Sequence, residues 1–356
     1  MTPLRAQYLF HLLFIIKCDV TDGGKAPRIQ LNDGNMMPVM GLGTFLGFDE
    51  KGQKEVREKE VELPVLWALE AGYRMLDTAS AYNNEEQVGK AIQRSNVPRK
   101  DVFIVTKLGS HEQREVLSSL RASLDRLNTT YIDLYLIHNP VAYKPDKSGY
   151  DIVDYLDTWK AMEQAKKMGL ARSIGISNFN ITMMERLLAH CQIKPSVLQV
   201  EVWLHITNND ILILDLVNVN LAQNKLLEFT KREGIEVMAY APFGSLFVKD
   251  SGPPPPRVND PGLVKMAQKY RKTVPQIVLR YLVQRGVIPI PKSVRKEKVV
   301  ENINIFDFEL STEEMDKISK FNKDYRVVWP SFWQDHPYYP FEKKDKPDPD
   351  LFKPKP

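Results

Sequence analysis

The sequence predicts an α/β protein in which eight parallel strands alternate with helices and close into a barrel. Short apolar runs alternate with longer amphipathic segments from about residue 29 to residue 322. The runs are apolar throughout, as expected of parallel strands that are covered on both faces. Polar or charged residues directly follow several runs, and a β/α barrel builds its active site from residues at such strand ends. Together these features favour a (β/α)8 TIM barrel.

The strands can be placed in order. Asn32-Asp33-Gly34 is a turn signal and predicts a small N-terminal β-hairpin that closes the bottom of the barrel. The first barrel strand then leads into Gly41-Leu42-Gly43-Thr44. The other strands are expected at residues 73–76, 102–106, 132–137, 173–177, 197–202, 235–240 and 287–290. A doubly wound sheet is the weaker alternative, because the glycines near residue 43 lack the acid of a dinucleotide-binding fingerprint.

Helices are expected between these strands. In residues 110–127 the apolar side chains of Val116, Leu120, Leu124 and Leu127 form one stripe. Ser311 followed by Glu314 forms a capping box at a helix start. The helices are expected at residues 60–71, from Asn84 or Glu85 to Ile92, and at 110–127, 151–168, 182–191, 222–234, 261–270, 275–285, 296–304 and 311–322.

Composition limits the class of protein. The chain has 356 residues, of which 43% are hydrophobic, so residues 25–341 can form one large domain. The net charge of +4 is made of mixed signs with no basic run interleaved with aromatics, which disfavours nucleic-acid binding. The two cysteines have neither metal-ligand nor disulfide-framework spacing, so no metal is expected. No apolar run is long enough to span a membrane, and nothing demands a dimer, so we expect a monomer.

The two ends carry separate expectations. Arg5 precedes the apolar run from Tyr8 to Ile16, so residues 1–24 are either a signal peptide or a disordered extension. The first case predicts a secreted protein with Asn128 and Asn180 as glycosylation acceptors, and the second a cytoplasmic one. An aromatic-rich C-terminal loop, residues 329–341, is expected to line a hydrophobic pocket over the barrel mouth. Residues 342–356 are expected to be disordered.

The segment from Tyr73 to Ile92 organises the candidate site. It contains Asp77 at a strand end and Tyr82 shortly before a helix. Lys107 follows the apolar run VFIVT, and His138 follows IDLYLI. A lone tyrosine or histidine is usually an ordinary core or surface residue. Four such groups just past the ends of barrel strands instead predict an active site.

These blocks resemble the aldo-keto reductases from about residue 29 to residue 329. The similarity lies in MGLGTF, GYRMLDTASAYNNEEQVGKAI, VTKL, DLYLIHNP, ARSIGISNFN, QVEV, AYAPFGS and IPIPKSVRKEKVVENINIFDFELS. Several blocks are most similar to insect members that reduce ecdysteroid ketones, the 3-dehydroecdysone reductases. The resemblance implies an NADP-dependent oxidoreductase that transfers hydride to a carbonyl group.

The resemblance makes Tyr82, Lys107, Asp77 and His138 the catalytic set, and the chemistry agrees. Tyr82 would protonate the carbonyl oxygen. A phenol with an ordinary pKa of about 10 is a poor acid at neutral pH, so a nearby cation is needed. Lys107 would lower the pKa of Tyr82, Asp77 would hold Lys107 charged and in place, and His138 would orient the carbonyl.

The resemblance also implies an NADPH site. Gly43, Thr44 and Phe45 would lie beside the nicotinamide, and Asp77 is also implied as a cofactor-binding residue. The other implied contacts are Ser177, Asn178 and Gln199 to the carboxamide, Tyr240 stacked on the ring, Phe243, Ser245 and Leu246 at the pyrophosphate, Lys292, Ser293, Val294 and Lys298 at the 2′-phosphate, and Glu301 and Asn302 near the adenine. Two lysines around a phosphate favour NADPH over NADH. The family usually has arginine where Lys298 stands, so bidentate phosphate binding is lost.

The substrate is implied less closely. The substrate-binding residues would be Phe45, Tyr82, His138, Gly109 and Trp329. Gly109 stands where the family often has a bulky aromatic, which predicts a wider mouth and a steroid-sized ketone such as 3-dehydroecdysone. A generalist reductase of aldehydes and dicarbonyls is an alternative. A catalytically silent barrel, either cofactor-binding or structural, is an alternative of another class, and an intact catalytic set argues against it.

Residues 203–217 depart most from the family. The connection between Val202 and the helix near Ala222 is longer than the family's by roughly fifteen residues and exceeds usual loop lengths. It is an apolar insertion, a splice variant or retained intron sequence. The last two are favoured, because the flanking segments match the family when joined directly.

Overall fold

The structure, a computed structural model, describes residues 23–49, 52–146, 148–200, 204–206, 211–213, 223–247, 256–321, 333–341 and 343. Its centre is an eight-stranded parallel sheet in the order β14-β13-β10-β9-β8-β7-β6-β3. The strands are β3 (Leu42–Gly43), β6 (Met75–Asp77), β7 (Phe103–Leu108), β8 (Ile132–Ile137), β9 (Ala171–Ser177), β10 (Val197–Val200), β13 (Glu236–Tyr240) and β14 (Val287–Ile290). The amides of Gly41 and Gly43 donate to the carbonyls of Pro289 and Pro291 at 3.2 and 3.1 Å, which joins β3 to the end of β14. The predicted (β/α)8 barrel is confirmed.

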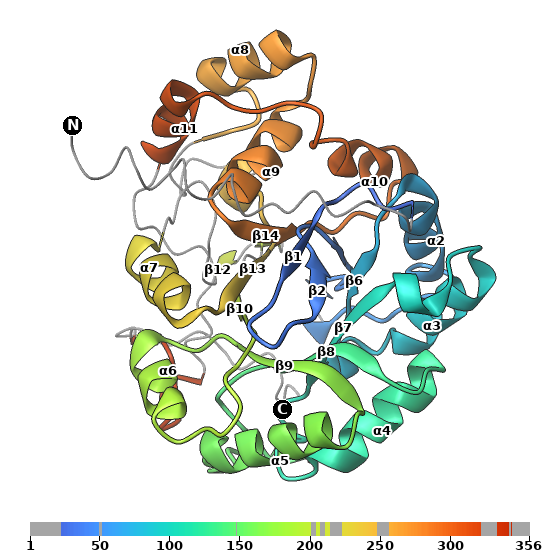
Figure 1. Ribbon diagram of the computed structural model, residues 1–356, viewed down its shortest axis with the longest axis vertical. Coiled ribbons are helices and arrows are strands. Elements are labelled where there is room, and N and C mark those ends of the chain that lie inside the picture. Colours follow the sequence, from blue (N-terminus) through green and yellow to red (C-terminus); the bar gives the residue numbers. More distant parts are fainter. Residues whose placement is uncertain are drawn as a thin grey trace.

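Helices surround this sheet (Figure 1). They are α2 (Glu62–Ala71), α3 (Glu85–Arg94), α4 (Val116–Leu127), α5 (Tyr155–Lys167), α6 (Ile181–Leu188), α7 (Asn224–Glu233), α8 (Pro261–Tyr270), α9 (Val274–Gln284), α10 (Lys296–Ile303) and α11 (Thr312–Ser319). The capping box predicted at Ser311 and Glu314 is present at the start of α11. No helix in the described ranges is long and apolar enough to cross a membrane.

The N-terminal hairpin closes one end of the barrel, as predicted. Strands β1 (Arg28–Gln30) and β2 (Met36–Pro38) pair antiparallel, and Gly34 between them has a φ of 87° that favours glycine. Leu31 and Met37 are buried in one cluster with Met75, Phe103, Leu134, Met238 and Ile288, side chains that fill the barrel interior. The hairpin therefore seals the end that lies opposite the carboxyl ends of the strands.

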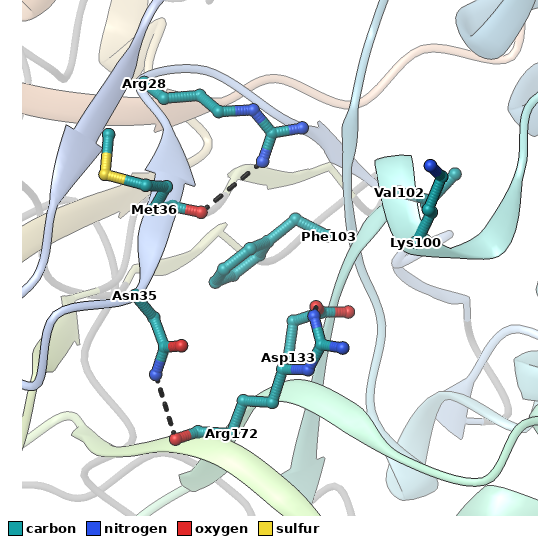
Figure 2. A pocket seen from close by; sticks show the side chains of 8 residues that line it. All are labelled: Arg28, Asn35, Met36, Lys100, Val102, Phe103, Asp133 and Arg172. Atoms are coloured by element: carbon teal, nitrogen blue, oxygen red, sulfur yellow. Dashed lines mark hydrogen bonds and ion pairs between the residues drawn. The ribbon is translucent and has the colours of Figure 1, made fainter. Parts of the chain in front are cut away.

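A polar cavity of about 200 Å³ lies between this hairpin and strands β7 to β9 (Figure 2). Its carboxylate, Asp133, is buried and pairs with Arg99 at 2.8 Å and with Arg172 at 3.5 Å. Arg28 donates to the carbonyls of Asp101 and Met36 at 3.0 and 3.4 Å. These charged groups bind the barrel's own wall, so the cavity belongs to the structural end of the fold.

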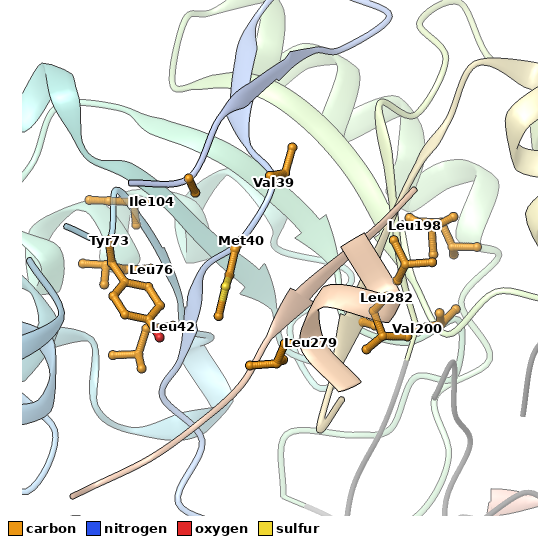
Figure 3. Packing of buried hydrophobic residues seen from close by; sticks show 14 of the residues in the cluster. Val39, Met40, Leu42, Tyr73, Leu76, Ile104, Leu198, Val200, Leu279 and Leu282 are labelled. Carbon is orange, nitrogen blue, oxygen red and sulfur yellow. The ribbon is translucent and has the colours of Figure 1, made fainter. Parts of the chain in front are cut away.

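A second, larger apolar cluster lies between the strands and the helix ring (Figure 3). Figure 3 shows Leu279 and Leu282 of α9 together with Leu198 and Val200 of β10 in this cluster. Strand side chains are therefore covered both inside and outside the barrel. This two-sided burial explains why the strands are continuous apolar runs in the sequence.

Two helices start four or more residues later than the sequence predicts. Helix α4 starts at Val116 and not near residue 110, because Gln113 donates to the carbonyls of Asn139 and Val141 at 2.8 and 3.1 Å and thereby fixes the preceding segment as a loop. Helix α5 starts after Asp154, whose side chain accepts from the amide of Leu156 at 3.0 Å as an N-cap.

The described part of the C-terminal aromatic segment, residues 333–341, lies on the loop that follows β8. Trp333 and Tyr339 are buried in a cluster with Val141, against which Tyr143 and Phe341 also pack. Within residues 203–217 the described parts form a two-stranded antiparallel sheet, β11 (Leu204–Ile206) with β12 (Ile211–Ile213). A further short hairpin that the sequence did not predict joins β4 (Phe48–Asp49) to β5 (Gly52–Gln53). The expectations for residues 1–22, for Trp329 and for the tail beyond 343 lie outside the described residues.

Candidate active site

The barrel brings the predicted catalytic set together. Asp77 is the last residue of β6, Lys107 lies in β7, and His138 directly follows β8. Tyr82 ends a short 3-10 helix, η1 (Ser80–Tyr82), between β6 and α3. Lys107 Nζ lies 2.7 Å from Asp77 Oδ1 and 3.2 Å from the hydroxyl of Tyr82. Adjacent parallel strands thus place the carboxylate, the ammonium and the phenol in contact.

The buried ion pair is held on all sides. Lys107 donates to Asp77, to the carbonyl of Thr78 at 2.9 Å, and to Tyr82. Asp77 Oδ2 accepts from Gln199 Nε2 at 2.6 Å. Burial raises the pKa of Asp77, and Lys107 and Gln199 oppose that rise. Burial likewise lowers the pKa of Lys107, and the charge of Asp77 opposes that fall. Each partner favours the ionised form of the other, so the group that faces the phenol of Tyr82 is a charged ammonium.

His138 is a buried, uncharged imidazole. Its ring meets that of Tyr82 edge to face, with centroids 5.5 Å apart and an interplanar angle of 77°. Burial, and next to it the positive charge of Lys107, holds the pKa of His138 well below its usual range. A neutral imidazole can still donate one hydrogen bond. Phe45 also packs against Tyr82 with ring centroids 4.7 Å apart, so two predicted substrate contacts, His138 and Phe45, lie against the phenol.

Residues that the sequence did not single out hold the Tyr82 turn. The hydroxyl of Thr78 donates to Asn84 Oδ1 at 2.6 Å, and Asn84 Nδ2 donates to the carbonyl of Thr44 at 3.0 Å. Asn83 has a φ of 55°, which asparagine tolerates better than most residues. Asn84 lies inside the segment that the sequence highlighted, but only the strand-to-loop contacts reveal its role.

The predicted nicotinamide contacts also lie together. Asn178, at a φ of 63°, donates to the carbonyl of His138 at 2.9 Å, and the hydroxyl of Tyr240 donates to Asn178 Oδ1 at 3.1 Å. Ser177 Oγ is buried without a hydrogen-bond partner among the described residues. A Cβ at Gly43 would lie 2.8 Å from the carbonyl oxygen of Ile290. Ser177 pairs in register with Gln199, the residue that donates to Asp77, and an unpaired buried hydroxyl there fits a cofactor that brings its own amide.

The predicted phosphate contacts follow β14. Lys298 Nζ pairs with Glu301 at 2.7 Å, and the amide of Arg295 donates to Ser293 Oγ at 3.2 Å. Burial of its ammonium lowers the pKa of Lys292, and the nearby charge of Lys54 lowers it further. Lys54 is therefore a further cation at this site, and no motif in the sequence pointed to it. Lys54 itself pairs with Glu60 at 2.6 Å, so Lys292 is the lysine here that would gain most from an anionic ligand.

The remaining predicted contacts are placed as follows. Val294 is exposed, and Asn302 is buried on α10. Leu246 is fully buried in η3 (Gly244–Phe247), and Phe243 packs edge to face on Phe247 with centroids 5.5 Å apart. The side chain of Ser245 lies outside the described part of the chain. Gly109 does not open empty space, because a Cβ there would lie 2.7 Å from Glu112 Oε2 and 3.0 Å from His111 Cε1. The expectation of a wider mouth at Gly109 needs this correction: a carboxylate and an imidazole take up the space directly beside the glycine.

The parallel barrel and the buried Asp–Lys–Tyr contact define a family. Residues 39–323 match the model of the aldo/keto reductase family, and the chain belongs to it. Within the residues described, no group of three histidine, cysteine or acidic side chains is arranged to hold a metal ion.

Two silkworm proteins are among the relatives of this chain. The aldo-keto reductase AKR2E4 of Bombyx mori is 46% identical over 323 residues, which cover 89% of this chain and 99% of the relative. Its crystal structure in complex with NADP superimposes with a TM-score of 0.79 over the same shares of the two chains. The silkworm protein AKR2E5 is 36% identical in sequence, and its crystal structure complexed with NADPH superimposes with a TM-score of 0.83. The match covers 92% of this chain and 97% of AKR2E5.

Proposed function

We propose that this chain reduces a steroid-sized ketone, such as an ecdysteroid ketone of the 3-dehydroecdysone type, with NADPH as the hydride source. The observation that carries the reductase assignment is the contact of Lys107 Nζ with the Tyr82 hydroxyl at 3.2 Å, backed by Asp77 at 2.7 Å. The chain is an NADP-dependent oxidoreductase by family, and its Bombyx relatives are solved with NADP and NADPH.

The residues of the chain divide the acid chemistry between them. A bound NADPH supplies the hydride that the carbonyl carbon accepts. Tyr82 gives its proton to the carbonyl oxygen, which becomes the hydroxyl of the product. Lys107 stabilises the phenolate left behind, because an ammonium within hydrogen-bonding distance favours the ionised phenol. His138, kept neutral by burial, donates a hydrogen bond that orients the carbonyl.

We expect this chain to hold the cofactor at both ends. Ser177, Asn178 and Gln199 lie where the carboxamide end would bind, and the unpaired hydroxyl of Ser177 would gain a partner. Lys292 and Lys298 lie beyond β14, where the 2′-phosphate would bind. NADPH is favoured over NADH because a 2′-phosphate would give Lys292, whose pKa burial lowers, an anionic partner, with the charge of Lys298 nearby.

The proposed substrate size rests on aromatic groups at the phenol and on the loop that follows β8. Phe45 packs on Tyr82, and the described part of the C-terminal segment adds Trp333 near Tyr143, with ring centroids 6.1 Å apart. Rings of this kind bind a large apolar body through burial of its surface. The polar pair His111 and Glu112 beside Gly109 favours a ketone that also carries hydroxyl groups over a bare hydrocarbon frame.

The test is NADPH oxidation by the purified protein with a panel that runs from small aldehydes and dicarbonyls to ecdysteroid ketones. We expect the highest kcat/KM for a hydroxylated polycyclic ketone and loss of turnover in Tyr82→Phe. Tyr131→Phe, on the opposite face of the barrel, is the matched control and should turn over normally. A preference for small aldehydes would contradict the substrate class. NADPH binding, seen as fluorescence quenching, without any turnover would instead support a silent barrel.

A further inference from the structure

One carboxylate joins the segment that carries the proton donor to the segment that carries its cation. Glu112 Oε2 accepts from the hydroxyl of Ser80 at 2.5 Å and from the amide of Gly109 at 2.7 Å. Ser80 begins the 3-10 helix that ends at Tyr82. Gly109 directly follows β7, two residues beyond Lys107. The same oxygen therefore touches the chain two residues from each member of the Tyr82–Lys107 contact.

The 3-10 helix needs such outside support. It is three residues long, and its own backbone bonds are the amide of Tyr82 to Ala79 at 3.0 Å and the amide of Asn83 to Ser80 at 3.4 Å. Short 3-10 turns have poor hydrogen-bond geometry, so outside contacts set where they lie. On one side Gln53 Nε2 donates to the carbonyl of Ala81 at 2.6 Å. Glu112 supplies the tie toward β7.

The contact between Lys107 and Tyr82 tolerates little movement of either residue. The 3.2 Å between Lys107 Nζ and the Tyr82 hydroxyl is at the long end of the range for hydrogen bonds to nitrogen donors. A small outward movement of η1 would therefore break it. The bonds to Glu112 are short and charge-assisted, which makes them stronger than neutral ones. Two short hydrogen bonds to Glu112 beside the longer Lys107–Tyr82 contact are suited to fixing the length of that contact.

We propose that Glu112 is a positioning residue that sets the distance between the Tyr82 hydroxyl and the Lys107 ammonium through Ser80 and Gly109. The proposal rests on the carbonyl reductase function given above. It also explains the glycine at residue 109, because any Cβ would lie 2.7 Å from the carboxylate oxygen that the amide binds. Glu112 itself need not touch the substrate to act in this way.

The experiment compares Glu112→Ala, Glu112→Gln and Ser80→Ala with wild type and with Glu115→Gln, an exposed carboxylate variant on the same loop. Each is assayed for kcat across pH, for NADPH affinity by fluorescence, and for thermal stability. Misplacement of reacting groups by about 1 Å can cost on the order of a hundredfold in rate, so we expect Glu112→Ala to lose about ten- to a hundredfold in kcat. NADPH affinity should stay within about twofold, because none of the cofactor contacts has changed.

The pH profile separates positioning from a merely structural role. When the phenol moves away from the ammonium, it becomes a weaker acid. The alkaline limb of kcat should therefore move to higher pH in Glu112→Ala and in Ser80→Ala. Glu112→Gln keeps an acceptor oxygen and should recover most of the activity. The double variant Ser80→Ala with Glu112→Ala should be little less active than Glu112→Ala alone, because both substitutions remove the same Ser80–Glu112 hydrogen bond.

The outcomes are distinguishable from failure of the reductase assignment. No NADPH-dependent turnover by wild type with any carbonyl compound of the panel overturns the assignment and the role of Glu112 with it. Wild-type turnover together with an unchanged kcat in Glu112→Ala overturns the role of Glu112 alone. The role of Glu112 is also overturned if Glu112→Ala loses activity while the alkaline limb of kcat stays in place and the melting temperature falls in parallel. That pattern indicates general destabilisation.

Discussion

Replacing Lys107 by methionine removes the ammonium from the buried Asp77 carboxylate while filling nearly the same volume. Lys107 is fully buried, and Asp77 is 2% exposed, so water cannot take the place of the lost charge. Breaking a buried pair from one side typically costs about 3–5 kcal/mol, because an uncompensated charge is left behind. With an unfolding entropy of about 2.1 cal/mol/K per residue, a loss of this size lowers the melting temperature by about 4–7 °C.

The matched variant replaces both partners, Asp77→Asn together with Lys107→Met. No charge then remains buried, and the asparagine can still accept the hydrogen bond that Gln199 donates to residue 77. Replacing both members of a buried ion pair is often neutral for stability, so we expect the double variant to recover most of the loss. It should stay catalytically inactive, because no ammonium faces Tyr82.

Thermal and denaturant unfolding of wild type, Lys107→Met and the double variant measure these differences. Lowering the pH should narrow the gap between wild type and Lys107→Met, because Asp77, whose pKa burial already raises, becomes protonated sooner without its cation. A single variant as stable as wild type, or a double variant no more stable than the single one, would refute the view of Asp77 as a charge held in place by Lys107.

Three further outcomes are expected. Burial lowers the pKa of His336 and of His138, so the unfolded chain binds protons that the folded chain does not; the free energy of unfolding should fall as the pH drops below about 6.5, and a rise in denaturant titrations would contradict this. Ser177→Ala should weaken NADPH binding in a fluorescence titration and leave the melting temperature nearly unchanged, because the hydroxyl has no described protein partner; equal affinity would argue against its contact with the cofactor. Gly43→Ala places a Cβ 2.8 Å from a carbonyl at the barrel seam and should cost about 1–3 kcal/mol in unfolding experiments, whereas Gly149→Ala, with nothing within 4 Å, should cost little.

Strands were the part of the fold that the sequence predicted best. Residues 132–137 and 287–290 form strands over the predicted ranges, because each apolar run is bounded by residues that end it. Helix starts were predicted less well, since tertiary contacts decide them. Residues 110–115 have a helical pattern, but Gln113 binds carbonyls of another loop, and Glu112 binds Ser80 of η1. A periodicity cannot show that a polar side chain has a partner some thirty residues away.

The candidate site divides in the same way. Asp77, Lys107 and His138 could be predicted because the rule that places them depends on strand ends, which the sequence locates. The supports of Tyr82 could not, because Glu112 is an acid in a polar loop with nothing in its spacing to mark it. Gly109 shows the risk of treating a glycine as empty space, since the neighbouring His111 and Glu112 occupy it.

The way in which the barrel buries its charge also explains the chemistry of the site. A buried ion pair is weak evidence for stability on its own, and it persists where every polar atom has a partner. Both oxygens of Asp77 are engaged, one by Lys107 and one by Gln199. An ammonium has three donors, and two of them are taken by Asp77 and the carbonyl of Thr78. Among the described residues the third goes to the hydroxyl of Tyr82, so the bond that completes the burial of the lysine is the same bond that makes the phenol an acid.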